Sequence, residues 1–186
     1  IVGFSEGNGH PYSWSAIFNG YNVNSMENCG FPVIPRYLEK QAWPISQNKE
    51  AKVVSVLGNN LMKSNHLSKT TFIPEVCISE DQFIESCDAI LFARDDVSKR
   101  HALLMRMLET KKYIFIDKPL ATDLVHLNQL YSTASFEDQI FSATCLRYSP
   151  EINLPEPSEI ENSNNLFMEC NFSGKWLTYA VHVIEP

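Results

Sequence analysis

Features that mark several common protein classes are missing from this sequence. None of its apolar runs approaches the roughly 18 to 20 residues of a membrane-spanning helix, and no basic stretch followed by an apolar one marks a signal peptide. Basic residues are too few for a nucleic-acid footprint, because 15 Lys and Arg face 22 Asp and Glu and leave a formal charge of -7. We therefore expect a soluble cytoplasmic protein that binds neither nucleic acid nor a membrane surface.

Cysteine is sparse and scattered. The five cysteines are odd in number and show neither C-x-x-C nor Cys/His ligand spacing, so the sequence predicts neither a disulfide framework nor a metal site. Reduced, mostly buried thiols are expected instead. The remaining composition is ordinary, since 186 residues with 44% hydrophobic and 20% charged side chains are typical of a globular chain of one or two domains.

Short apolar runs alternate with segments of helical periodicity over much of the chain. Strands are predicted at residues 1–4, 53–57, 88–93, 113–116 and 141–146. One helix is predicted after the turn at residues 3–9, with Pro11 in its first turn, and another after a capping box at residues 79–82. Two more are predicted, one around residues 102–108 and one from about Thr122 with Leu124, Leu127 and Leu130 facing inward. This rhythm is typical of βαβ units and predicts an α/β fold with a doubly wound parallel Rossmann sheet.

The pattern changes twice along the chain. Residues from about 19 to 52 contain Asn-Gly and Trp-Pro pairs that break any long period, and we interpret them as an insertion of loops and short helices. After Pro150 a proline-rich linker precedes a strand-like run, which predicts a Rossmann domain over residues 1–148 and the start of an incomplete α+β domain over residues 149–186. Because the chain starts without methionine and stops as an apolar pattern begins, we expect a piece of a longer protein.

A glycine-rich turn follows the first apolar run. Gly3, Gly7 and Gly9 give the spacing G-x-x-x-G-x-G, with Ser5 where the dinucleotide-binding fingerprint G-x-G-x-x-G has its second glycine. In that fingerprint the turn lets backbone amides approach a pyrophosphate at the N-terminus of the following helix. We therefore expect Gly3, Ser5, Gly7, Asn8 and Gly9 to bind a dinucleotide, with a ligand-free tight loop as the alternative.

The second strand ends without the acidic residue that usually accepts hydrogen bonds from the adenosine ribose of NAD. Gly58, Asn59 and Asn60 stand there instead, and Asn59 is expected to contact the cofactor. A ribose 2′-phosphate would meet no repulsion at this position, and Lys63 with Ser64 follows closely to bind it. The cofactor is therefore predicted to be NAD or NADP, with NADP favoured.

The most specific segment is Asp117-Lys118-Pro119, directly after a predicted strand and thus at the carboxyl edge where open α/β sheets bind ligands. Here the sequence resembles the Gfo/Idh/MocA family of NAD(P)-dependent oxidoreductases, whose hallmark is a Glu-Lys-Pro tripeptide at this place. The family's Arg-x-x-Pro motif is similar to residues 147–150, and its Asp-x-Gly-x-His-x-x-Asp motif is similar to residues 178–185. These similarities occur in the family's order along the chain.

The resemblance implies hydride transfer between a nicotinamide and a hydroxyl-bearing carbon of a sugar, cyclitol or nucleotide sugar. It implies that Lys118 stabilises negative charge on the reacting oxygen and that His182 takes or gives the hydroxyl proton. Further cofactor contacts are expected at Arg94, Asp95, Asp117, Lys118 and Arg147, of which Arg147 is expected to order the domain junction. The family also leads us to expect a homo-oligomer formed through the C-terminal domain.

Several residues depart from the family pattern. Thr178 and Ala180 replace the aspartate and glycine of the motif around His182, and a charged Arg-Asp-Asp turn at residues 94–96 replaces Thr-Pro-Asn. Arg100 stands where the family commonly has a histidine, one residue before His101. The remaining histidines are expected to be structural or exposed: His10, His66 and His126.

Three other functions stay open. A redox-inactive nucleotide-binding or sensor protein of the same family would account for Thr178 and the altered glycine turn. A non-redox Rossmann protein, such as a nucleotide-sugar transferase, would have no need of Lys118. A structural subunit could use the aromatic, proline-containing insertion between Tyr21 and Trp43 to contact a partner.

Overall fold

The computed structural model describes residues 1–149 and 180–184 of the chain. The chain divides into two compact units, Ile1–Phe141 and Ser142–Pro186. The first unit carries the expected parallel α/β fold. The second unit lies mostly outside the described residues, so the α+β domain and the boundary near residue 148 stay predictions.

The sheet of the first unit consists of parallel strands. They are β1 (Ser55–Leu57), β2 (Glu75–Cys77), β3 (Ala89–Phe92), β4 (Tyr113–Ile116) and β5 (Ile140–Phe141). The N-terminal residues 1–3 join the β1-β2 pair to the β3-β4-β5 group, because Val2 forms parallel bridges to both Leu57 and Phe92. The resulting order is β2, β1, residues 1–3, β3, β4, β5, which is the strand order of a dinucleotide-binding Rossmann sheet.

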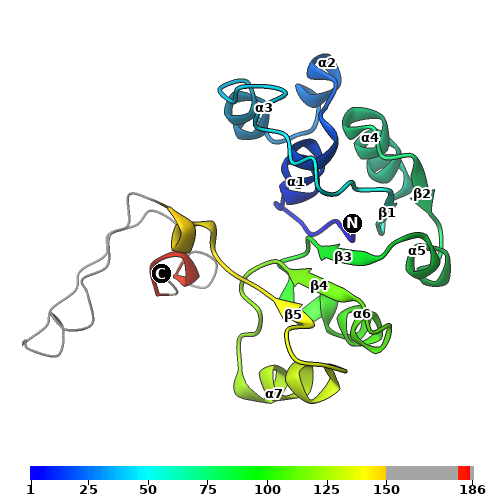
Figure 1. Ribbon diagram of the computed structural model, residues 1–186, viewed down its shortest axis with the longest axis vertical. Coiled ribbons are helices and arrows are strands. Elements are labelled where there is room, and N and C mark those ends of the chain that lie inside the picture. Colours follow the sequence, from blue (N-terminus) through cyan, green and yellow to red (C-terminus); the bar gives the residue numbers. More distant parts are fainter. Residues whose placement is uncertain (150–179, 185–186) are drawn as a thin grey trace, which may run out of the picture. The chain divides into compact units, whose positions relative to one another are not determined.

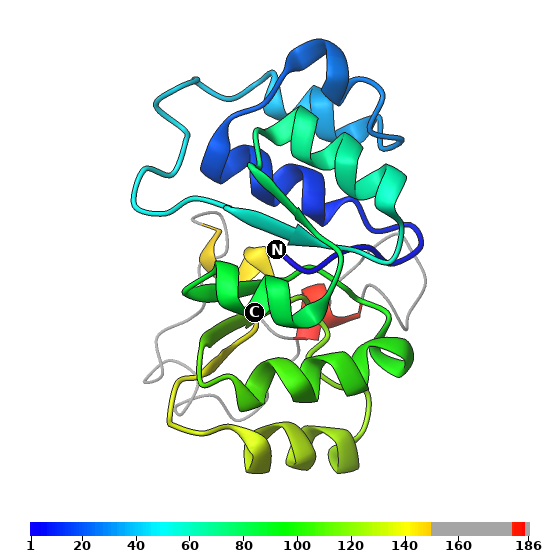
Figure 2. The ribbon, with the colours of Figure 1, turned by 90° about the vertical axis from the view of Figure 1, so that its right-hand side faces the viewer.

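Helices cover this sheet in two groups. Those of the first unit are α1 (His10–Asn19), α2 (Val23–Met26), α3 (Val33–Leu38), α4 (Leu61–Thr71), α5 (Glu80–Ser86), α6 (Val97–Glu109) and α7 (Leu124–Thr133). Figures 1 and 2 show α1 to α4 at one end of the unit and α6 and α7 at the other, with strands between them. Each group encloses a hydrophobic cluster, one around Leu38 and Leu67 and the other around Phe92 and Met107.

Local signals in the sequence account for several helix ends. Pro11 lies in the first turn of α1, where a missing amide costs no hydrogen bond. Ser79 caps α5 by accepting a hydrogen bond from the Gln82 amide at 3.2 Å, as the capping box predicts. Residues 19–52 hold only the short helices α2 and α3 and loops, which confirms the irregular character expected of this segment.

The structure corrects three predictions about elements. The last strand ends at Phe141 instead of Leu146, because β5 pairs with β4 only as far as Phe115 and β4 itself ends one residue later. The following residues form the 3-10 helix η1 (Cys145–Tyr148). Leu124 is 73% exposed instead of facing inward, since the first turn of α7 lies outside both hydrophobic clusters. Helix α4 and strand β2 were not predicted at all.

Candidate functional site

Four turns meet at one edge of the sheet. They follow residues 1–3, β1, β3 and β4, and comprise residues 3–9, 58–60, 93–96 and 117–120. Because all these strands are parallel, their carboxyl ends lie on the same side. The turns after residues 1–3 and after β3 flank the point where the strand order reverses, which is where such sheets bind ligands.

Close packing explains most of the glycines in these turns. A Cβ on Gly3 would lie 2.8 Å from Cγ of Pro11, and one on Gly9 would lie 2.5 Å from Cδ1 of Ile34. Gly7 is different, since its φ of +77° is left-handed and a Cβ there would meet nothing within 4 Å. The turn therefore packs tightly at both ends and is open at Gly7, where a ligand can approach the backbone.

Two buried side chains fix the glycine-rich turn to its neighbours. Ser5 donates a hydrogen bond from its hydroxyl to the carboxylate of Asp95 in the turn after β3. Asn8 donates from Nδ2 to Oδ2 of Asp117 at 2.8 Å and accepts from the His10 amide at 2.8 Å. Both side chains are thus occupied in holding the turn. The backbone amides of Glu6, Gly7 and Gly9 form no hydrogen bond within the described part of the chain, so they can donate to a phosphate.

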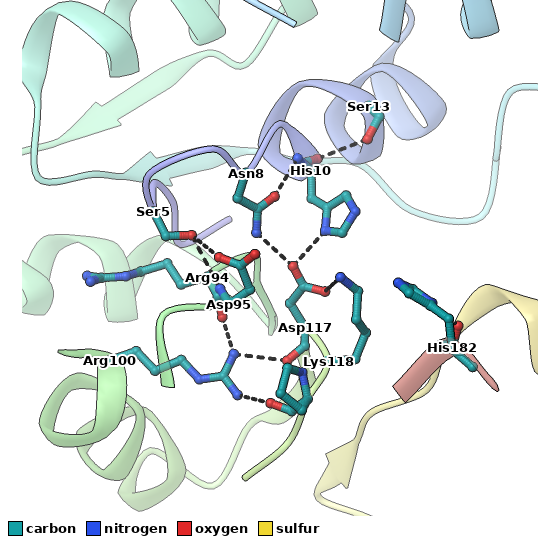
Figure 3. Close-up of polar contacts among 12 residues, drawn as sticks. Ser5, Asn8, His10, Ser13, Arg94, Asp95, Arg100, Asp117, Lys118 and His182 are labelled. Carbon is teal, nitrogen blue, oxygen red and sulfur yellow. Dashed lines mark hydrogen bonds and ion pairs between the residues drawn. The ribbon is translucent and has the colours of Figure 1, made fainter. Parts of the chain in front are cut away.

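Asp117 lies at the centre of a polar cluster at the end of β4 (Figure 3). Its side chain is 2% exposed, and Oδ2 lies 2.6 Å from Nδ1 of His10 as well as accepting from Asn8. Its other oxygen, Oδ1, lies 4.0 Å from Nζ of Lys118, whose side chain is 15% exposed. Burial by itself raises the pKa of the Asp117 carboxyl, but the hydrogen bond from His10 and the charges of His10 and Lys118 hold that pKa below its ordinary value.

Arg100 holds the segment that carries Lys118. This fully buried side chain donates from Nη1 to the carbonyls of Arg94 and Asp117, and from Nη2 to those of Pro119 at 2.5 Å and Leu120 at 3.1 Å. Burial lowers the pKa of the guanidinium to about 10, against the opposing effect of nearby carboxylates led by Asp117. The group is therefore charged at neutral pH and fixes the backbone on both sides of Lys118.

A cavity of about 470 Å³ borders the glycine-rich turn. Besides residues 4–8 and Tyr12, it is lined by Asn59, Asn60 and Lys63 and by residues 29–31 of the insertion. Asn59, Asn60 and Lys63 are exposed, as a role in cofactor binding requires. Ser64 cannot join them, contrary to expectation. Its hydroxyl is buried in contact distance of Gly58, so it cannot reach a ribose phosphate.

A second cavity, of about 510 Å³, is lined by Gly3. Gly58, residues 78–81 and Arg94 are among the residues that line it. Arg94 forms a two-pronged ion pair with Asp96, from Nε to Oδ1 at 2.9 Å and from Nη2 to Oδ2 at 2.5 Å. Arg94 therefore borders the expected cofactor region with its charge largely neutralised.

The second unit holds the remaining predicted site residues. His182, in helix α10 (Val181–Ile184), has Nδ1 2.5 Å from the hydroxyl of Thr144. Arg147 is exposed in η1. Thr178, which replaces the family's aspartate, lies outside the described residues. Among the residues that the structure describes, the Thr144 hydroxyl is therefore a hydrogen-bond partner of the His182 ring.

No cluster of three or more His, Cys, Asp or Glu side chains in residues 1–149 and 180–184 is arranged to hold a metal ion. None of the helices in the described part of the chain has the length and hydropathy of a membrane span. Cys29 and Cys77 are buried free thiols, whereas Cys145 is an exposed one.

Sequence reasoning missed two members of the site. The sequence predicts a structural or exposed role for His10, yet its ring contacts the carboxylate of Asp117, which Lys118 also approaches. Arg100 was noted only as a departure from the family pattern, although it supports the turn after β4. A signal for Arg100 exists in its spacing, because it precedes Leu104 by four residues and so shares the apolar face of α6, where an arginine needs buried acceptors.

Comparison with known proteins gives a match over most of the first unit. The family model described as an oxidoreductase family with an NAD-binding Rossmann fold, Gfo/Idh/MocA, matches residues 33–144. The matched range contains Asn59, Arg94, Arg100, Asp117 and Lys118. It includes neither the glycine-rich turn nor His182. No curated protein matches the chain.

Proposed function

The chain belongs to the Gfo/Idh/MocA oxidoreductase family, and on this premise we propose that it is an NAD(P)-dependent dehydrogenase or reductase. Its substrate in this proposal is a sugar, cyclitol or nucleotide sugar, in which a hydroxyl-bearing carbon exchanges hydride with the nicotinamide. The observation that carries the proposal is the placement of Lys118. Its backbone is fixed at the carboxyl edge of β4 by Arg100, and its ammonium faces the buried Asp117.

The residues at this edge fit a dinucleotide. The open, left-handed Gly7 and the backbone amides of Glu6, Gly7 and Gly9 suit a pyrophosphate. Cavities of about 470 and 510 Å³ adjoin the turn and leave room for the rest of the cofactor. When bound, the nicotinamide supplies the hydride chemistry, and the protein supplies orientation and electrostatics.

Lys118 is proposed to hydrogen-bond the reacting oxygen of the substrate. The Lys118 ammonium, 4.0 Å from the Asp117 carboxylate, is proposed to stabilise negative charge that develops on that oxygen. The hydroxyl proton must pass to a side chain beside the substrate, and the position of His182 in the family motif makes it one candidate for this role. Neither role requires a metal ion.

The proposal is tested by following reduced-nicotinamide absorbance with a panel of sugars, cyclitols and nucleotide sugars. The wild type is expected to turn over at least one class. Lys118→Ala should lose about 10²-fold or more in kcat, since one oxyanion-stabilising donor is removed, and should still bind NADPH. Lys99→Ala, which removes an exposed lysine of α6, is the matched control. Binding of the cofactor without turnover of any substrate would indicate the redox-inactive sensor instead.

We also propose a preference for NADP over NAD. Asn59 and Asn60 present no negative charge at the rim of the cavity, and the exposed Lys63 lines the same cavity. Fluorescence titration should give tighter binding of NADPH than of NADH, and Lys63→Ala should remove most of that difference. Tighter binding of NADH by the wild type would contradict the preference.

A further inference from the structure

Two titratable side chains approach different carboxylate oxygens of the buried Asp117. Lys118 faces Oδ1 at 4.0 Å, and His10 contacts Oδ2 at 2.6 Å. We infer that His10 is a further catalytic residue, whose Nε2 exchanges the hydroxyl proton of the substrate while Asp117 holds its ring. This inference rests on the proposed function, because it assigns the proton step of the same reaction.

The hydrogen bond to Asp117 decides which ring nitrogen can act as a base. An ionised carboxylate only accepts hydrogen bonds, so Nδ1 of His10 must carry the hydrogen in the 2.6 Å contact. The low pKa of Asp117 agrees with an ionised carboxylate. In neutral His10 the lone pair is therefore on Nε2, and that nitrogen has no hydrogen-bond partner among the described residues. This is the arrangement by which a carboxylate orients a general base.

The ring of His10 is fixed from a second direction. It stacks on Trp14, with ring centroids 5.0 Å apart and planes 9° apart, and Trp14 in turn forms a T-shaped contact with Phe115 in β4. The His10 side chain is nevertheless 34% exposed, while its Asp117 partner is 2% exposed. Its orientation is thus set by the buried Asp117 and the partly buried Trp14, whereas the ring remains accessible.

His126 lacks this combination of a buried carboxylate and a fixed, accessible ring. His126 also pairs with a carboxylate, that of Asp123 at 2.5 Å, but both side chains are more than 40% exposed at the start of α7. A buried carboxylate holding a histidine at the ligand-binding edge of the sheet is found at His10.

The step balances as a two-electron oxidation. The C–H bond of the hydroxyl-bearing carbon breaks and its electron pair leaves with the hydrogen as hydride, which reduces the nicotinamide. The O–H bond breaks, its electron pair forms the carbonyl, and its proton passes to Nε2 of His10. Reduction runs through the same steps in reverse. Lys118 meanwhile stabilises the negative charge on the oxygen.

Replacing His10 by asparagine separates the catalytic from the structural role. The asparagine amide can still donate to Oδ2 of Asp117 in place of Nδ1, but it offers no base at the position of Nε2. In the full-length protein, His10→Asn should keep its fold and its NADPH affinity and lose about 10²- to 10⁴-fold in kcat. His126→Asn, the same exchange in an exposed His–Asp pair, should retain wild-type activity.

A chemical rescue and a spectrum make the test specific for proton transfer. Imidazole in the buffer should restore turnover of His10→Ala in proportion to its concentration, which loss of a purely structural contact would not allow. Long-range ¹H–¹⁵N NMR of the cofactor-free wild type should show neutral His10 protonated at Nδ1. A ring protonated at Nε2 would overturn the inference without reference to any substrate.

The outcomes for the two proposals are distinguishable. Wild-type turnover together with full activity of His10→Asn would overturn the role of His10 and leave the proposed function in place. The same holds if imidazole rescues His182→Ala but not His10→Ala. Absence of turnover by the wild type on the whole panel would overturn the proposed function, and the catalytic role of His10 with it.

Discussion

Arg100 illustrates how much one side chain contributes at this site. The residue is 1% exposed, and its guanidinium donates to four backbone carbonyls in two turns. A lysine in its place would carry the same charge but could satisfy only part of this set, because its ammonium is a point donor instead of a planar fork. Charged hydrogen bonds contribute roughly 1.5 to 3 kcal/mol each, so unmet carbonyls in this interior are costly.

We expect Arg100→Lys to lower the free energy of unfolding by about 3 kcal/mol. Urea unfolding followed by circular dichroism measures this difference. Arg106→Lys is the matched control, since Arg106 lies on the same helix in exposed ion pairs with Glu80 and Asp81. Exposed pairs are screened by water, and that variant should lose less than about 1 kcal/mol. Equal losses in the two variants would contradict the assigned role of Arg100.

Among the elements, the glycine-rich turn makes the sharpest prediction. Gly7 has a positive φ, so an alanine there strains the backbone, although its methyl group meets no other atom within 4 Å. That methyl group would lie where the ligand approaches. We expect a loss of stability of about 1 to 2 kcal/mol together with weaker binding of NADPH, measured by fluorescence titration.

Gly20 provides the comparison for this variant. It also has a positive φ, of +78°, but it follows the C-terminus of α1, at the other end of that helix from the turn. A Cβ on Gly20 would come no closer than 3.9 Å to another group, the side-chain oxygen of Gln47. Gly20→Ala should therefore lose stability and keep its affinity for NADPH. If both variants bound NADPH as the wild type does, the turn would not be the pyrophosphate site.

Elements with apolar periodicity could be predicted from the sequence, and those without it could not. The elements β3, α6 and β4 coincide with segments rich in large apolar residues and occur where expected. Helix α4 was missed because its buried face consists largely of Ser64, Thr70 and Thr71, with Leu67 as its buried large apolar residue. β2 was missed because it has three residues and begins at Glu75. Polar residues buried by tertiary packing give no hydrophobic signal.

In the molecule as a whole, the sequence could predict which turns form the site but not how they contact one another. Lys118 was identified because Asp117, Lys118 and Pro119 are consecutive and follow an apolar strand. The contacts of Asn8 and His10 with Asp117 join residues 109 and 107 positions apart. No local spacing encodes such pairs, because they depend on the strand order that brings residues 1–3 beside β3.

Transfer of labelled hydride tests the central claim most directly. The full-length protein is incubated with NADPH deuterated at C4 of the nicotinamide and with carbonyl forms of the sugar, cyclitol and nucleotide-sugar panel, and the products are analysed by mass spectrometry. One class of product should gain a single carbon-bound deuterium with the wild type and with Lys99→Ala, and far less with Lys118→Ala. NADPH binding without deuterium in any product would contradict hydride transfer by this protein.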